Sequence, residues 1–211
     1  MKILLTIFLS LGICQFGLGQ TYSREEIISE AKKHLKEAVG EQASQYFKYG
    51  GSDTYKFRTK TGKEKWKKLP KASKTRGNFI ETQIKFEIDH PDYKYKWVNK
   101  YVFVKLDSSL NPKEKIYTGH VPSFILKNEP SNWLSEEKID SIINKLSLKA
   151  AVKPIIKRLE FDVKAHEHYW RVFNTLAEER CFADVEILSI NPITGDVIEH
   201  REERQYVMHC Y

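Results

Sequence analysis

The chain has 211 residues and a formal net charge of +7, with 41% hydrophobic and 12% aromatic residues. Helix-forming and strand-forming segments alternate without a short repeat, which excludes collagenous, coiled-coil and low-complexity proteins. The length suffices for one large domain or two small ones with a buried core.

The first 19 residues are typical of a secretory signal peptide. Lys2 gives a positive end, an apolar run covers residues 3–13, and Gly17 and Gly19 are small residues suited to signal peptidase. We expect cleavage after Gly19 and a secreted or periplasmic protein. A membrane anchor is an alternative, although the run is shorter than the roughly 20 residues that span a bilayer. Lipidation at Cys14 is a second alternative. No later stretch is apolar enough to cross a membrane.

The first predicted helix-plus-sheet unit, residues 20–120, opens with a helix. Ser23 and Glu26 have the spacing of a capping box, and Gly40 is a natural stop. Between them, apolar residues recur at helical spacing: Ile27, Ala31, Leu35 and Ala38.

Long antiparallel strands are predicted to follow. Residues 79–89 alternate in the manner of a half-buried strand. One face of that strand carries Ile80, Thr82, Ile84, Phe86 and Ile88. The next strand, 95–107, turns at Asn111-Pro112 toward Ile116 and Tyr117, and its inward positions are Val102, Val104 and Leu106.

A basic loop is predicted between this helix and these strands. Residues 56–76 hold ten basic residues and one acid, so the remainder of the chain is close to neutral. The candidate contacts for a polyanion or a partner are Lys60, Lys63, Lys65, Trp66, Lys67, Lys68 and Lys71. Lysines interleaved with aromatic residues suit an anionic envelope surface or an acidic partner, whereas nucleic acid is not expected outside the cell. The alternative is a solvated loop that Trp66 and Leu69 pin to the body.

The second predicted unit, residues 135–211, follows a linker at 119–133. Ser135 caps a helix whose apolar stripe comprises Ile139, Ile142, Ile143 and Leu146. Strands are expected at 159–163, 169–176 and 204–209.

Residues 181–200 predict a β-hairpin. An apolar strand runs into Asn191-Pro192-Ile193-Thr194-Gly195-Asp196 and another leaves it. Proline presets one turn position and glycine supplies a left-handed one. The predicted fold class is therefore α+β, with two helix-plus-antiparallel-sheet units in tandem.

Residues 135–200 resemble the PepSY-type domain family. The closing strand–turn–strand of that family matches residues 190–198, the opening turn resembles Ser135-Glu136-Glu137, and the preceding strand resembles Tyr169-Trp170-Arg171-Val172. The first half matches only in layout, and the chain departs from the pattern at Pro154 and after His200. The resemblance implies a non-catalytic, extracytoplasmic module, which in some relatives is an inhibitory or chaperone-like pro-segment of a secreted peptidase. We therefore expect a secreted or periplasmic module that engages a protein or peptide, as a peptidase-inhibitor-like or envelope-associated factor. Attachment of the 56–76 loop to an anionic surface is the alternative.

Two cysteines, Cys181 and Cys210, follow the signal peptide. An even number of cysteines in an oxidising compartment permits one disulfide, which would add about 3 kcal/mol to the free energy of unfolding. In a hairpin centred on residues 193–194, Cys181 lies opposite Tyr206, so a bend after Glu202 is needed to bring the two sulfurs together.

Few residues indicate catalysis. His166 and His168 are spaced to share one face of a strand and to bind zinc with a third ligand, which is the metal-dependent alternative. A solvent-facing strand edge explains the same pair. The sequence contains no nucleophile elbow and no glycine-rich phosphate loop, so we expect neither an enzyme nor a cofactor.

Three tryptophans, Trp97, Trp133 and Trp170, lie near strands or the linker. Most of the aromatic residues are expected in the core. Some are predicted to line a groove between the two halves, where a peptide adds to a sheet edge. This hypothesis requires a sheet edge that is free of charge, bulges and covering loops.

Overall fold

The computed structural model describes residues 20–207 except 52 and 97. The predicted signal peptide (residues 1–19), Trp97 and Cys210 lie outside the described residues. The described chain has an α+β fold with two antiparallel sheets, which confirms the predicted class. None of its helices combines the length and the apolar character needed to cross a bilayer.

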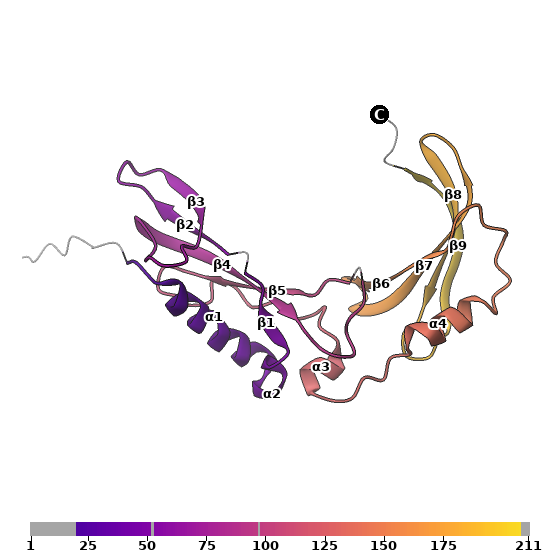
Figure 1. Ribbon diagram of the computed structural model, residues 1–211, viewed down its shortest axis with the longest axis horizontal. Coiled ribbons are helices and arrows are strands. Elements are labelled where there is room, and N and C mark those ends of the chain that lie inside the picture. Colours follow the sequence, from indigo (N-terminus) through magenta and orange to yellow (C-terminus); the bar gives the residue numbers. More distant parts are fainter. Residues whose placement is uncertain (1–19, 52, 97, 208–211) are drawn as a thin grey trace, which may run out of the picture.

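The elements follow the predicted order of helix, sheet, helix, sheet (Figure 1). The helices are α1 (Arg24–Val39), α2 (Glu41–Ser44), α3 (Ser123–Lys127) and α4 (Glu136–Ile143). Sheet A comprises β1 (Phe47–Tyr49), β2 (Thr54–Arg58), β3 (Glu64–Lys68), β4 (Asn78–Ile88) and β5 (Tyr101–Leu106). Sheet B is a meander of β6 (Ile156–Asp162), β7 (Glu167–Glu178), β8 (Phe182–Ile190) and β9 (Val197–Tyr206).

Helix α1 covers one face of sheet A (Figure 1). The predicted capping box is present, because the Glu26 amide donates to Ser23 Oγ at 3.1 Å and the Ser23 amide donates to Glu26 Oε2 at 2.6 Å. The buried face ends on Val39 rather than on Ala38, which is exposed. The helix ends at Gly40, whose φ of 91° suits glycine.

Strand β4 is the centre of sheet A. β1 and β2 pair with one edge of it, and β5 pairs with the other. The predicted alternation holds from Thr82 to Ile88 but fails at Ile80, because a β-bulge lies there: Lys56 pairs with Glu81, and the next residue pairs with Phe79. Phe79 is therefore buried in place of Ile80.

The strand predicted at 95–107 begins only at Tyr101. The preceding residues leave the sheet, and Tyr93 and Tyr95 pack against aromatic rings near sheet B. The segment predicted as a linker, 119–133, is not an exposed spacer, because it contains α3 and buries Phe124 and Ile125.

The predicted hairpin joins β8 to β9, and β9 runs without a break from Val197 to Tyr206. The separate strand predicted at 204–209 is therefore wrong. Asn191 Oδ1 accepts the amides of Ile193 at 2.8 Å and Thr194 at 3.2 Å, which fixes the turn.

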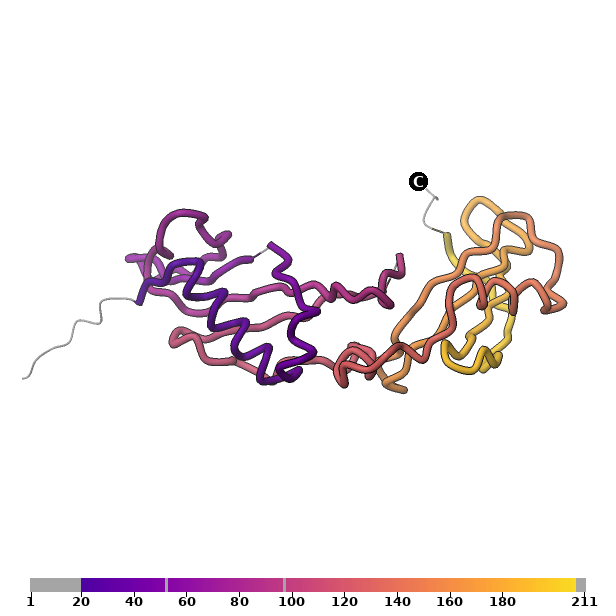
Figure 2. The backbone as a smooth tube through the Cα atoms, turned by 60° about the horizontal axis from the view of Figure 1, so that its bottom comes forward, coloured from indigo at the N-terminus to yellow at the C-terminus, as the bar shows by residue number. Residues whose placement is uncertain are grey.

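The two sheets form the arms of an open V, with helices α1 and α4 on the outer sides (Figures 1 and 2). Buried apolar residues from both sheets and from α1, α3 and α4 form one contiguous cluster. The inner faces of both arms carry no helix. These helix-free faces are the surfaces that the fold leaves open.

Replacement of Gly195 by alanine tests the packing of the hairpin on α4. Gly195 has φ +80°, and a Cβ there would lie 2.5 Å from Ile142 Cδ1. Gly62 is the matched control, with φ +81° and no atom within 4 Å of its Cβ position. We expect Gly62→Ala to cost about 1 kcal/mol of unfolding free energy through backbone strain, and Gly195→Ala to cost about 1–3 kcal/mol more through overpacking. Urea unfolding measures both, and equal losses would contradict this packing.

Candidate binding surfaces

The predicted basic loop is an ordered β-hairpin. Strands β2 and β3 pair from Thr54↔Lys68 to Arg58↔Glu64, and the turn closes where the Thr59 amide donates to the Lys63 carbonyl at 2.8 Å. The hairpin forms the edge of sheet A at the end of the molecule remote from sheet B (Figure 1). Each of the five residues of β3 is exposed.

The basic side chains of this segment are largely unmatched by acids. Its one acid, Glu64, lies 2.6 Å from Lys56 Nζ and 2.9 Å from an Arg58 nitrogen. Hydrogen bonds from these two cations hold the pKa of Glu64 at about 2. The other eight basic residues of the segment make no ion pair with described residues and are all exposed: Lys60, Lys63, Lys65, Lys67, Lys68, Lys71, Lys74 and Arg76.

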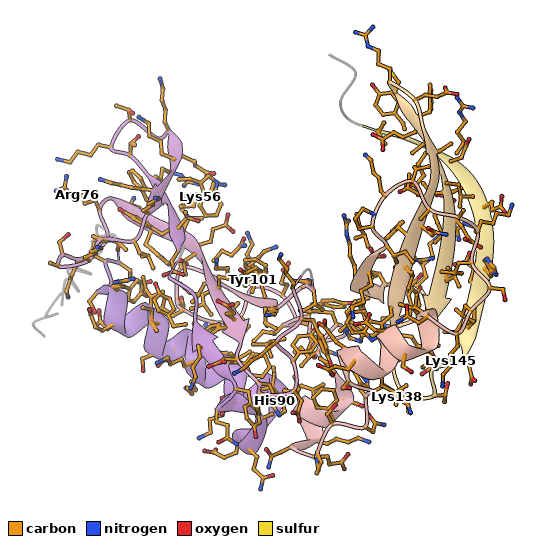
Figure 3. All side chains as sticks on the ribbon, turned by 45° about the vertical axis from the view of Figure 1, so that its right-hand side comes forward. Lys56, Arg76, His90, Tyr101, Lys138 and Lys145 are labelled. Carbon is orange, nitrogen blue, oxygen red and sulfur yellow. The ribbon has the colours of Figure 1, made fainter. Side chains whose placement is uncertain are left out.

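The predicted pinning of the segment holds for Leu69 but not for Trp66. Leu69 is buried, whereas 54% of Trp66 is exposed. Trp66 lies opposite Lys56 on the helix-free face of sheet A, as the register shows. The six candidate lysines and Trp66 therefore belong to the segment that carries Lys56 and Arg76, both of which are labelled on one arm in Figure 3.

The histidine pair proposed as a metal site is divided between two environments. His166 does not belong to a strand, because it lies in the β6–β7 turn with φ 54° and is exposed. His168 packs among aromatic rings, with centroids 4.9 Å from both Trp133 and Phe161. The described residues contain no group of three His, Cys, Asp or Glu side chains placed to hold a metal ion.

His168 belongs to an aromatic junction between the two sheets. The junction comprises Tyr93, Tyr95, Phe124, Trp133, Phe161, His168 and Trp170. Trp133 is its hub, with ring contacts to the 93–95 segment, to α3 and to β7. Burial lowers the pKa of His168 to about 4. His168 is therefore neutral near pH 7.

Acid is expected to weaken the junction through His168. Its pKa in the folded protein lies below the ordinary value of 6.5, so its contribution to stability is present above pH 6.5 and is lost as the pH falls toward 4. The loss amounts to at most about 3 kcal/mol. The free energy of urea unfolding, measured across this range, should fall less steeply for His168→Phe than for the parent.

His166→Asn is the control for this prediction, since His166 is exposed and asparagine tolerates its left-handed backbone. We expect this variant to retain the acid sensitivity of the parent. Equal pH dependence of His168→Phe and the parent would show that His168 does not titrate inside the junction.

Cys181 lies at the start of the β8–β9 ladder. The amide of Val207 donates to its carbonyl at 2.8 Å, so Cys181 lies opposite Val207 rather than opposite Tyr206. A bulge at Ser189–Ile190 causes this shift of one residue. The bond to Cys210 stays a prediction, because Cys210 lies outside the described residues.

The edges at β3, β9 and β5 do not favour addition of a peptide strand. Strands β3 and β9 are exposed and rich in charged residues, which is how natural sheets avoid edge pairing. The edge of β5 is partly covered, because its Lys105 carbonyl accepts the Lys113 amide at 2.9 Å and its Tyr101 carbonyl lies 3.0 Å from His120 Nε2.

A pocket between the two halves does exist beside the predicted linker. It has a volume of about 430 Å³ and is bordered by Trp133, Leu126, Pro192 and Ile193, together with His166 and His168. Trp170 is buried and does not line it. Trp133 is therefore one of the aromatic residues that line a pocket between the halves.

Sequence reasoning missed a second pocket, on the helix-free face of sheet A. It is lined by Gln83, Asn99, Tyr101, Phe103, Lys105, Glu114, Tyr117 and His120. The inward positions predicted in β5, Val102, Val104 and Leu106, are indeed buried. The same alternation places Tyr101 and Phe103 on the outward face. Two aromatic residues at outward positions were the sequence feature that could have predicted this pocket.

Comparison of the chain with protein-family models, curated proteins and solved structures gives no match. The PepSY resemblance of residues 135–200 therefore stays a prediction.

Proposed function

We propose that this protein is an exported, non-catalytic binding module that attaches to an anionic envelope surface through the β2–β3 hairpin. The observation that carries the proposal is the gathering of eight exposed basic side chains, unmatched by described acids, at one end of the molecule. Each lysine close to an anionic lipid surface contributes about 1 kcal/mol of attraction.

The distribution of the lysines favours a surface of headgroups over a protein partner. Lys67 lies opposite the buried Tyr55, on the side of the hairpin that faces α1, whereas Lys68 shares the helix-free side with Trp66. Lys60 and Lys63 extend the charge around the turn. A protein of fixed shape contacts one face of a hairpin, but mobile headgroups can surround its end.

Trp66 adds an apolar contact to this charge. Its exposed ring lies among lysines on β3. An indole ring has an apolar body and one polar N–H, which suits the boundary between headgroups and acyl chains. The hairpin therefore offers both electrostatic and interfacial attraction.

Vesicle cosedimentation tests the attachment. The protein should bind vesicles of phosphatidylglycerol and phosphatidylcholine, and the binding should weaken steeply as salt screens the charges. The triple variant Lys63→Gln, Lys65→Gln, Lys67→Gln should lose about two orders of magnitude in partitioning. Vesicles of phosphatidylcholine alone should bind neither protein.

The matched control neutralises three exposed lysines outside the hairpin, Lys127, Lys138 and Lys145, the last two of which are labelled on the other arm in Figure 3. We expect this variant to partition like the parent, apart from a small general effect of net charge. An equal loss of vesicle partitioning in both triple variants, or partitioning that does not change with salt concentration, would refute attachment through the hairpin.

Binding of a protein or peptide is the second candidate function. The pocket beside Trp133 supports it, since apolar side chains there lie next to polar groups of the turns. Ile193 is an exposed apolar residue at its rim. The partner in this case is a peptide segment with an apolar side chain that enters the pocket.

A photo-crosslinking residue placed at Ile193 tests this second candidate. Ile198, an exposed isoleucine on β9 that does not line the pocket, is the control position. A defined adduct from the secreted fraction at position 193, resistant to salt and absent at 198, is the expected result. The same adducts at both positions would argue against a site at the pocket.

A further inference from the structure

The pocket on the helix-free face of sheet A has the composition of a ligand site. It has a volume of about 300 Å³. Three aromatic side chains line it, and each leaves much of its surface exposed: 38% for Tyr101, 43% for Phe103 and 49% for Tyr117. Exposed aromatic residues gathered at one concave place indicate recognition rather than packing.

The register of β4 and β5 fixes the floor of this pocket. Phe103 pairs with Lys85 and Lys105 pairs with Gln83, so these side chains share the face opposite α1. Tyr101 is labelled on this side in Figure 3, between the two arms. The pocket therefore opens into the V and is separate from the basic hairpin.

Neighbouring groups hold the aromatic rings in place. The Tyr117 ring stacks on His120 with centroids 5.6 Å apart and planes 19° apart, and His120 Nε2 lies 3.0 Å from the Tyr101 carbonyl. Lys85 Nζ lies 4.5 Å from the Tyr101 ring centroid and so occupies one face of that ring. Phe103 is therefore the main stacking surface, and Tyr117 adds only the face that is turned away from His120.

The polar lining is neutral overall and rich in hydrogen-bonding groups. Lys105 is matched by Glu114, with Nζ and Oε1 2.9 Å apart, and burial lowers the pKa of His120, so it is uncharged near pH 7. Asn99 accepts the Tyr101 amide through Oδ1, which leaves its NH₂ group for a ligand. Gln83 adds a second amide at the rim.

We propose that this pocket binds a neutral hexopyranose ring of an oligosaccharide. A pyranose has an apolar face of C–H groups that stacks on an aromatic ring, and hydroxyl groups that pair with amides and with an ion pair. A purely apolar ligand would desolvate the amides and the Lys105–Glu114 pair without replacing their hydrogen bonds. The residues that line the pocket carry no net positive charge for an anion, and the ammonium group of Lys85 beside them lies on the Tyr101 ring.

Saturation-transfer NMR with chitotetraose, cellotetraose and maltotetraose tests the proposal. The parent should transfer saturation to ring protons of at least one of these sugars. Phe103→Leu keeps an apolar side chain but removes the flat ring, and should weaken binding about tenfold. Phe103→Trp restores a ring and should restore binding.

Trp66→Leu is the matched control, because Trp66 is an exposed aromatic residue on the same face of sheet A that does not line the pocket. Phe103 and Trp66 are both exposed, so we expect unchanged thermal unfolding in these variants. Absence of transfer to all three sugars, or transfer unchanged in Phe103→Leu, overturns the proposal. The hairpin variants should bind sugar normally, so the test is independent of vesicle attachment.

Discussion

The packing of Trp133 at the aromatic junction is the interaction on which the rest of the structure depends. Its ring contacts Tyr93, Phe124 and His168, which come from three segments far apart in the sequence. Through these contacts, the cores under α1 and α4 become one apolar cluster. Neither sheet has helices on both faces, so without the junction each arm would rest on a small core of its own.

The open inner faces follow from this arrangement. Because α1 and α4 lie on the outer sides, the inner face of sheet A is largely open to water, whereas the inner face of sheet B buries a second, small apolar cluster of Ala183, Val185 and Ile187. The helix-free face of sheet A carries charged residues together with three exposed aromatic residues, Trp66, Tyr101 and Phe103. Its charge is unevenly distributed, since Glu64 pairs with the two cations of β2, and the cations on the turn and on β3 make no ion pair with described residues. The hairpin therefore attracts anions, while the pocket around Phe103 is neutral.

Local signals in the sequence predicted much of the fold. The Ser23 capping box, the Ser135 cap and the turn at Asn191–Asp196 depend on neighbouring residues, and each is present. The β2–β3 hairpin escaped prediction because its lysines hide the alternation of period two that marks a strand. The bulge at Ile80 also escaped, because it is set by pairing with a strand that had not been foreseen.

The candidate sites were harder to predict than the fold. The basic segment was visible as charge, but its form as a hairpin edge depends on pairing with β4. His168 carries no local sign of burial, since its environment is supplied by Trp133 and Phe161. The alternation of β5 places Phe103 on the outward face. The pocket itself had no local sign in the sequence, however, because only the path of residues 107–120 brings Tyr117 beside Phe103.

Differential scanning calorimetry tests the central claim, that the junction joins both arms into one cooperative body, most directly. A single transition is predicted for residues 20–211, with a calorimetric enthalpy equal to the van't Hoff enthalpy. Two separable transitions, or a calorimetric enthalpy well above the van't Hoff value, would show that the arms unfold independently and that Trp133 does not join them.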